Sequence, residues 1–193
     1  MREIPVEWTA RVLRPCPVLL LSSRHERRSN LAPLTRYALL SQAPTLIGFS
    51  LAPSSMSCHL VRQSGECILC VPDVSLLSEV HDAGIVSGRD CDKLRRLRLL
   101  LRGSRCVAPF VPVGALASLE CEVRESRLVG GDRHFVVQVV SAEVDDEAFG
   151  EEWRPESAAW FHHLGGDRYL CRGEVLRAQP VVIEADLPLD DER

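Results

Sequence analysis

Hydrophobic residues in the first third of the chain occur in short runs separated by polar turns, a pattern typical of β-strands. Residues 18–23 are largely apolar and lead through a charged turn at 25–29 into a second extended stretch that opens at 30–33. Two further strands are predicted at 45–51 and at 66–71, the latter closed by Pro72. The first two strands are expected to form a hairpin.

Helical spacing interrupts this strand pattern three times. A helix is predicted from about Met56, where Ser54 or Ser55 can cap it, to the glycine C-cap at Gly65. A second helix is predicted from Asp73, its cap, to Gly84. A third is predicted to begin at a cap by Asp90, with an apolar face made of Leu94, Leu97 and Leu101 and with arginines on its other sides.

Strict alternation returns over 118–124. This pattern predicts an antiparallel strand in which one set of side chains faces in (Leu119, Cys121 and Val123) and the other faces out (Glu120, Glu122 and Arg124). The turn Gly130-Gly131-Asp132 leads into a long valine-rich strand over 133–144, followed by an acidic irregular segment at 145–155. The fold class is therefore predicted to be mainly β with helices, an antiparallel barrel with helices packed on it.

The chain length fits a single domain. The 193 residues, 46% of them hydrophobic, suffice for one sizeable core, and we expect residues 1–14 and 171–193 to be extensions of a single 1–193 domain. No targeting pattern or membrane span is present at the start, so a cytoplasmic location is expected, with the eight cysteines reduced.

The charge balance limits the choice of partners. The formal net charge is −4, which argues against a general nucleic-acid or anionic-membrane binder. Any site for a polyanion must therefore be local.

Several kinds of site lack their sequence signature. Cys67 and Cys70 have the spacing of a metal or redox pair, but residues three apart in a strand point to opposite faces, and His162 and His163 have no carboxylate at ligand spacing. No metal site is therefore expected. No Gly-x-Ser-x-Gly elbow, Walker loop or Gly-x-Gly-x-x-Gly turn is present. A hydrolase or a Rossmann-type nucleotide fold is thus disfavoured.

Two serine-rich helix starts remain as candidates for binding a phosphate. One is the turn that holds Ser54, Ser55 and Ser57, and the other is Ser87-Gly88-Arg89, followed by Lys93, which is the single lysine of the chain. Hydroxyl groups, free helix N–H groups and a cation are what a phosphomonoester needs. Together they favour a phosphate-bearing ligand.

The order of these motifs resembles the flavin reductase-like, FMN-binding split-barrel family, the group of flavoredoxins and NAD(P)H:FMN oxidoreductases. The similar segments span about 15–170: Pro17-Val-Leu-Leu-Leu, Asn30-Leu-Ala-Pro-Leu-Thr, Pro44-Thr-Leu-Ile-Gly-Phe-Ser-Leu-Ala-Pro-Ser, Ser64-Gly-Glu-Cys-Ile-Leu-Cys-Val-Pro, Gly84-Ile-Val-Ser-Gly-Arg-Asp-Cys-Asp-Lys, Leu119-Glu-Cys-Glu-Val and His163-Leu-Gly-Gly-Asp-Arg-Tyr. The Ser-Gly-Arg-Asp-x-Asp-Lys block is the most specific. The resemblance implies a six-stranded antiparallel split barrel and a homodimer with FMN at its interface.

The resemblance also implies a set of FMN-binding residues. It places Thr35, Arg36 and Tyr37 along the isoalloxazine ring, and Ala52, Ser54, Ser55 and Ser57 near the ribityl chain and phosphate. It assigns Ser87, Gly88, Arg89 and Lys93 to the rest of the phosphate cradle, and Tyr169 to the edge of the pocket. No catalytic side chain is implied, because the flavin carries out the hydride chemistry.

The sequence departs from the family pattern at two places. Many reductases of the family have a histidine near the nicotinamide directly after the Gly-Asp of the late hairpin, whereas here Arg133 follows Asp132 and His134 comes one place later, on the other strand face. Position 55 is serine where a basic residue is frequent.

Three functions are compatible with these features. The first is an NAD(P)H-dependent FMN reductase using NADH or NADPH, with a monooxygenase or another protein as possible electron acceptor. The second is a flavoredoxin-like electron carrier that does not oxidise a nicotinamide directly, which the arginine at position 133 favours. The third is an interaction protein that kept the barrel without the flavin.

Overall fold

The computed structural model describes residue 13, residues 16–97 and residues 99–171. The two predicted extensions therefore lie almost entirely outside the described residues. No helix in the described part of the chain is long and apolar enough to span a bilayer.

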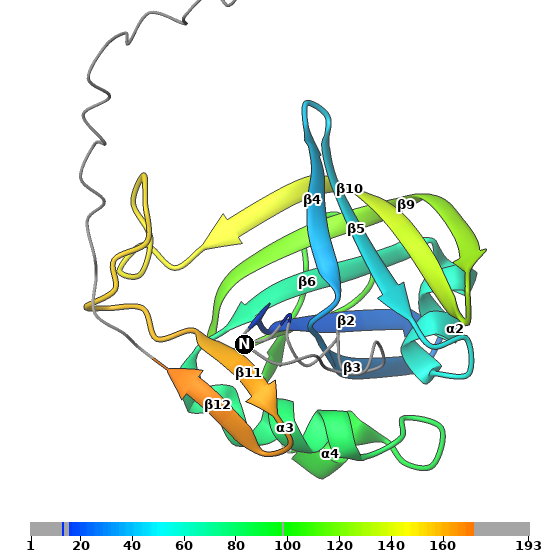
Figure 1. Cartoon of the computed structure of the whole chain (residues 1–193), viewed down its shortest axis with the longest axis horizontal. Helices are drawn as coiled ribbons and strands as arrows, with labels where there is room; N and C mark the ends of the chain where they lie inside the picture. Colours follow the sequence, from blue (N-terminus) through cyan, green and yellow to red (C-terminus); the bar gives the residue numbers. More distant parts are fainter. Residues whose placement is uncertain (1–12, 14–15, 98, 172–193) are drawn as a thin grey trace, which may run out of the picture.

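Seven antiparallel strands form the main sheet, in the order β3-β2-β6-β9-β10-β5-β4. Their bounds are β2 (Leu19–His25), β3 (Arg28–Leu34), β4 (Tyr37–Gln42), β5 (Thr45–Leu51), β6 (Glu66–Pro72), β9 (Ala115–Val129) and β10 (Asp132–Val144). The sheet curves into a barrel, and the β4–β5 hairpin rises beyond the barrel body (Figure 1). The mainly-β class is confirmed. The sheet has seven strands rather than six because β4, whose sequence does not alternate, pairs with β5 as an edge strand.

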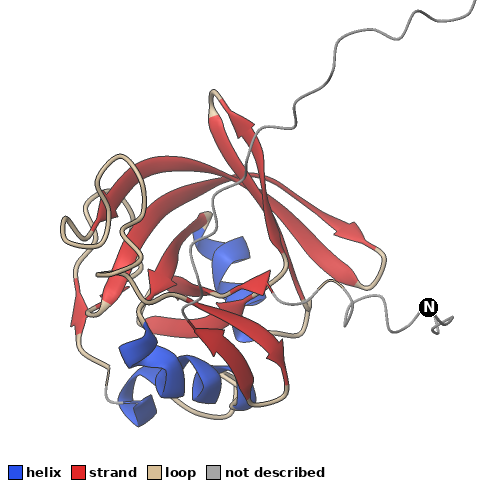
Figure 2. Cartoon of the chain, turned by 60° about the vertical axis from the view of Figure 1, so that its left-hand side comes forward, coloured by secondary structure: helices blue, strands red, loops and turns tan. Residues whose placement is uncertain are grey.

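The remaining elements cover the ends and sides of this sheet. Two small sheets pair β1 (Cys16–Pro17) with β11 (Phe161–Gly165) and β12 (Arg168–Cys171), and β7 (Leu101–Arg102) with β8 (Val111–Pro112). The helices are α2 (Met56–Ser64), the 3-10 turn η2 (Val74–Leu76), α3 (Leu77–Ile85) and α4 (Lys93–Leu97). Figure 2 shows α2 within the curve of the sheet, apart from the other helices, which lie together outside it.

Two hydrophobic cores lie on opposite faces of the sheet. The barrel interior packs Phe49 and Phe135 against Cys58 and Val61 of α2. The outer core packs Leu20 and Ile68 against Val80 of α3 and Phe161 of β11. Because the first half of β2 and most of β6 are buried on both faces, each contains an uninterrupted apolar run, at 19–21 and 67–72. Cys67 lies in the inner core and Cys70 in the outer one, which confirms that they point to opposite faces.

The termini of α2 agree with the sequence prediction. The Ser55 side chain caps the helix by accepting a hydrogen bond from the Cys58 N–H, and Gly65 ends it in the left-handed conformation, with φ of 72°. The cap of the second helical segment is also confirmed, since Asp73 accepts from the Ser75 N–H.

Two predictions were wrong, one about the extent and cap of the third helix and one about the exposure of Glu120. The third helix is only Lys93–Leu97, and Asp92 rather than Asp90 accepts a hydrogen bond from its first turn, through the Arg95 N–H. Leu101 belongs instead to β7. Glu120 does not face solvent: it is 1% exposed, because the segment at 105–107 folds over its strand face.

Candidate functional site

Strand β3 and the segment that follows α3 run against each other at very short range. A β-carbon added to Gly84 would lie 3.0 Å from Pro33 Cγ, and one added to Gly88 would lie 2.1 Å from Asn30 Oδ1. Only glycine permits the second approach, because real Cβ contacts are never that short. The Ser-Gly-Arg block predicted from the sequence is therefore pressed against β3.

The N-terminus of α2 lies at the same contact between β3 and the segment that follows α3. Ser57 is buried and accepts a hydrogen bond of 2.8 Å from Asn30 Nδ2, which ties α2 to β3. The N–H groups of Met56 and Ser57 precede the first intrahelical hydrogen bond, so they remain available as donors. Asn30 Oδ1 is buried and, among the described residues, has no hydrogen-bond partner.

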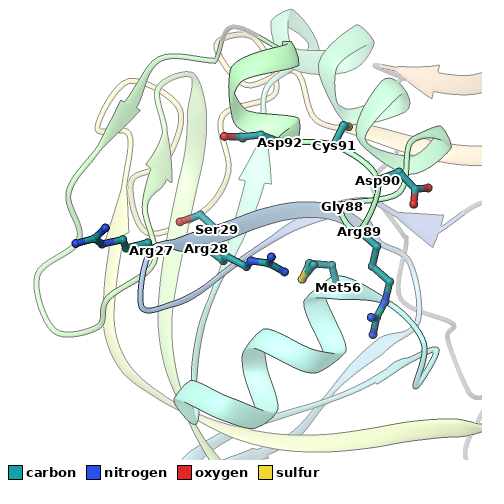
Figure 3. A pocket seen from close by; sticks show the side chains of 9 residues that line it. All are labelled: Arg27, Arg28, Ser29, Met56, Gly88, Arg89, Asp90, Cys91 and Asp92. Atoms are coloured by element: carbon teal, nitrogen blue, oxygen red, sulfur yellow. The ribbon is translucent and has the colours of Figure 1, made fainter.

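A pocket of about 360 Å³ opens beside this contact. We call it the helix pocket; its lining residues are Arg27, Arg28, Ser29, Met56, Gly88, Arg89, Asp90, Cys91 and Asp92. In Figure 3 the Arg28 side chain points toward Met56, and Arg89 extends along the start of α2. Arg89 Nε donates to the carbonyl oxygen of Ser54, while the Arg89 N–H donates to the Ser87 hydroxyl. Arg89 is therefore hydrogen-bonded to both serine-rich turns, the one at Ser54 and the one at Ser87.

The surroundings of α2 are electropositive. Burial raises the pKa of the Cys58 thiol, whereas the guanidinium groups of Arg133, Arg62 and Arg89 act in the opposite direction and favour its anion. The same positive groups, together with the helix N-terminus, attract a bound anion. This charge is local in a chain whose net charge is −4.

Lys93 lies deeper than the sequence indicated. Its side chain is 5% exposed, and Nζ donates to two main-chain oxygens, that of Leu31 on β3 at 3.2 Å and that of Ala83 on α3 at 2.6 Å. Desolvation lowers the pKa of this ammonium group. Its contacts in the structure thus fasten α3 to β3, beneath the Ser87–Arg89 turn.

A second pocket, of about 270 Å³, lies near the other end of β3. We call it the tyrosine pocket; it is lined by Val18, Pro33, Thr35, His81, Gly84, Ile85, His163, Gly166 and Tyr169. Two predicted residues, Thr35 and Tyr169, therefore come together here although they are far apart in the chain. The Tyr169 hydroxyl and His81 Nδ1 are 3.0 Å apart and form a hydrogen bond.

The other predicted residues surround the two pockets at greater distance. Tyr37 begins β4, and its hydroxyl lies 3.5 Å from the Pro17 carbonyl oxygen; burial, with a smaller effect from Cys16, raises its pKa to about 12. Arg36 is exposed and forms an ion pair with Asp132. Ala52 is exposed in the turn before α2. None of these three lines either pocket.

The late hairpin places its histidine outside the barrel. Phe135 and Val137 of β10 are buried in the interior. His134 directly precedes Phe135 and therefore lies on the opposite face, where its Nδ1 is 3.2 Å from the Ser50 hydroxyl. Arg133 shares the inward side with Phe135. This arrangement agrees with the strand-face prediction made from the sequence.

The sequence analysis missed three lining residues of these pockets, Arg28, His81 and His163, and also Asn30, which contacts Gly88 beside the helix pocket. Asn30 was read only as part of a strand, and Arg28 only as part of a turn. His163 was weighed as a metal ligand and quoted in a segment similar to the family, whereas no role was predicted for His81. Alternation along β3 could have flagged Asn30, because a polar residue in a buried position needs a partner, but no local signal joins His81 to Tyr169.

Comparison with known proteins identifies the wider group. The family described as flavin reductase like domain matches residues 13–178. An uncharacterized protein of Pyrococcus abyssi is 30% identical over 139 residues, which is 72% of this chain and 80% of that protein.

Solved structures agree in fold. An FMN-binding protein from Thermus thermophilus with bound 1-cyclohex-2-enone superimposes with a TM-score of 0.79 at 22% identity, covering 93% of this chain and 97% of that one. Nitrilotriacetate monooxygenase component B from Bacillus cereus superimposes with a TM-score of 0.82 at 16% identity, covering 92% of this chain and 98% of that one. Flavoredoxin from Methanosarcina acetivorans superimposes with a TM-score of 0.78 at 17% identity, covering 96% of each chain. The split-barrel fold is thus confirmed, and the chain belongs to the flavin reductase-like domain family.

Proposed function

We propose that this protein binds FMN along β3 and reduces it with a nicotinamide, as an NAD(P)H:flavin oxidoreductase. The observation that carries the proposal is the pair of pockets at the two ends of β3, one basic and one aromatic. Ser29 lines the first and Pro33 the second, so the pockets are about 13 Å apart at 3.3 Å per strand residue. FMN as a whole, with its phosphate, ribityl chain and flat ring, is long enough to reach from one pocket to the other.

The residues present fit the two ends of FMN. We place the phosphate at the start of α2, where Ser54, Ser55 and Arg89 surround free N–H groups. The buried, unpartnered Asn30 Oδ1 under Gly88 is an acceptor suited to a ribityl hydroxyl. The flat ring belongs at Thr35 and the tyrosine pocket, below Tyr37. Lys93 then supports the phosphate cradle from inside by holding the loop that carries Ser87 and Gly88.

The chain's task in this reaction is positional. Bound flavin supplies the hydride chemistry. The protein anchors one end of the cofactor by charge, holds the ring against apolar and aromatic groups, and leaves one ring face open to the electron donor. The structures of component B and flavoredoxin belong to proteins of the same fold, so a monooxygenase or another redox protein is the partner class we propose as electron acceptor.

Arg89→Ala is expected to weaken FMN binding about tenfold, because a charge-assisted hydrogen bond contributes about 1.5–3 kcal/mol. Fluorescence quenching of FMN titrated with protein measures the dissociation constant. Arg96→Ala is the matched control, since Arg96 is exposed on α4 and lines neither pocket. Equal affinities of the two variants would contradict the phosphate assignment.

The first measurement is the visible spectrum of the purified protein after incubation with FMN and desalting. Retained flavin absorption supports the proposal, and stopped-flow mixing with NADH or NADPH then tests the reductase activity. A protein that retains no flavin would contradict it.

A flavin-binding electron carrier is the second candidate. The observation that favours it is the arrangement at β10, where Arg133 points inward and His134 is held outside by Ser50. This candidate predicts a flavin that is bleached by dithionite and remains oxidised with both nicotinamides, so the same stopped-flow experiment separates the two.

We further propose a homodimer that uses the β4–β5 hairpin. Leu39 and Leu40 on β4 are 58% and 52% exposed, and the hairpin, whose first strand begins at Tyr37, rises beyond the barrel body (Figure 1). Leu40→Asp is expected to shift the molar mass measured by light scattering toward the monomer, because burying a carboxylate in an apolar interface is costly. Leu164→Asp, at an exposed leucine of β11, is the control. Equal masses for both variants would contradict this interface.

A further inference from the structure

The tyrosine pocket contains a hydrogen-bonded pair that binding of a flat ring does not require. Tyr169 Oη lies 3.0 Å from His81 Nδ1, and the two rings meet edge to face with centroids 5.8 Å apart. Phe161 packs against Tyr169 edge to face at 5.5 Å. The tyrosine is thus fixed on two sides, with its oxygen beside the histidine nitrogen. In the tautomer that carries the proton on Nδ1, His81 donates to Tyr169 Oη and leaves the tyrosine O–H free to donate elsewhere.

The tyrosine hydroxyl carries a proton at neutral pH, which a proton donor requires. Burial, with a smaller contribution from Asp167, raises the pKa of Tyr169, so its hydroxyl keeps its proton at neutral pH. His81 is half-buried on α3 and is therefore partly accessible to solvent. A phenol hydroxyl backed by an imidazole is a common arrangement for general acid catalysis.

The other titratable groups around the pair are committed elsewhere or exposed. His163 also packs against the Tyr169 ring, at a centroid distance of 5.1 Å, but its Nε2 is 3.1 Å from the Gly166 carbonyl oxygen. Asp82, next to His81 on α3, and Asp167, in the turn before β12, are both exposed. In the described part of the chain, His81 is the group hydrogen-bonded to the tyrosine hydroxyl.

We propose that Tyr169, supported by His81, is the proton donor to the flavin ring when the ring is reduced. This inference rests on the proposed function, because it requires the flavin ring to lie in the tyrosine pocket. Tyr169 is then a catalytic residue, and His81 is a positioning residue that restores its proton.

The step balances in electrons and protons. A nicotinamide gives up a hydride, which carries two electrons and one proton to the ring. The neutral reduced flavin needs one more proton, which leaves Tyr169 Oη as the O–H bond breaks. His81 passes a proton to the resulting phenolate, and solvent reprotonates His81. Both residues end in their starting states.

The test is single-turnover reduction of the FMN-loaded protein by NADPH and NADH in stopped flow, between pH 5.5 and 8.5, in H₂O and in D₂O. Tyr169→Phe keeps the ring and its packing and is expected to slow reduction about 100-fold, the typical contribution of a positioned acid. The solvent isotope effect of the wild type should disappear in this variant. His81→Gln should flatten the pH profile, whereas His163→Gln, the loss of a pocket histidine without the hydroxyl contact, should preserve its shape.

A binding measurement separates this proposal from the proposed function. The FMN dissociation constant of Tyr169→Phe is expected to stay within about threefold of the wild type, because one neutral hydrogen bond contributes little to affinity. Wild-type protein that binds no FMN or is not reduced by either nicotinamide would overturn the proposed function and this inference with it. Flavin that binds and is reduced with the same rate, isotope effect and pH profile in Tyr169→Phe as in the wild type would overturn the inference alone.

Discussion

Glu120→Ala is expected to lower the free energy of unfolding by about 3 kcal/mol or more, since three backbone N–H groups lose hydrogen bonds to a buried charged acceptor, and such bonds contribute about 1.5–3 kcal/mol each. Glu120 Oε1 accepts from the Arg105 N–H at 2.8 Å, and Oε2 accepts from the N–H groups of Cys106 and Val107 at 2.6 and 3.1 Å. The carboxylate thus satisfies three backbone groups of one connection between β7 and β8. Urea unfolding followed by circular dichroism measures the change.

Glu122→Ala is the matched control for this prediction. Glu122 lies two residues further along β9 and forms a half-exposed ion pair with Arg124 at 3.0 Å. Such pairs contribute less than about 1 kcal/mol, so this variant should unfold close to the wild type. Equal losses in the two variants would mean that the buried carboxylate does not organise the segment at 105–107.

The fold was predictable where short-range chemistry determines it. Ser55 and Gly65 delimit α2 because a serine hydroxyl can cap free N–H groups and a glycine can adopt positive φ. The continuous apolar run of β2 follows from burial on both faces. These signals involve residues within a few positions of each other, so one sequence contains them.

The interior polar groups were not predictable in the same way. Alternation places Glu120 on the outward face of β9, and that is the face it occupies, but a segment some 14 residues earlier in the chain covers this face and donates to it. The link between His81 and Tyr169 spans 88 positions. Such contacts depend on how distant segments meet, for which a single sequence has no periodic signal.

The same limit applies to the one lysine. A lone lysine beside Ser87 and Gly88 looks like a phosphate ligand, because both turns carry hydroxyl groups. Its side chain instead reaches under the turn to β3. The resemblance to the family points to this loop as a phosphate site, which stays a prediction. The direction of the ammonium group depends on the packing of α3 and α4 against β3.

Lys93→Met is therefore expected to lower the free energy of unfolding by about 2 kcal/mol and to weaken FMN binding as a consequence. The main-chain oxygens of Leu31 and Ala83 lose a shared donor, and each buried unsatisfied acceptor costs about 1–3 kcal/mol, partly offset because methionine relieves the desolvation of a buried charge. Methionine retains the length of the side chain, so little packing is lost. Urea unfolding of the FMN-free protein and fluorescence titration with FMN measure the two effects.

These measurements distinguish two possible roles of Lys93, that of a direct phosphate ligand and that of an internal support. A direct phosphate ligand would lower FMN affinity about tenfold at unchanged stability, and that loss would shrink as salt screens the charge. An internal support lowers stability without ligand, and its effect on affinity is insensitive to salt, because the ammonium group is only 5% exposed. Arg95→Met, at the exposed neighbouring cation on α4, controls for the loss of one positive charge. Because Lys93 Nζ donates two of its three N–H groups to carbonyl oxygens and is buried beneath the turn, we expect the second pattern, with Arg89 as the cation that contacts the phosphate.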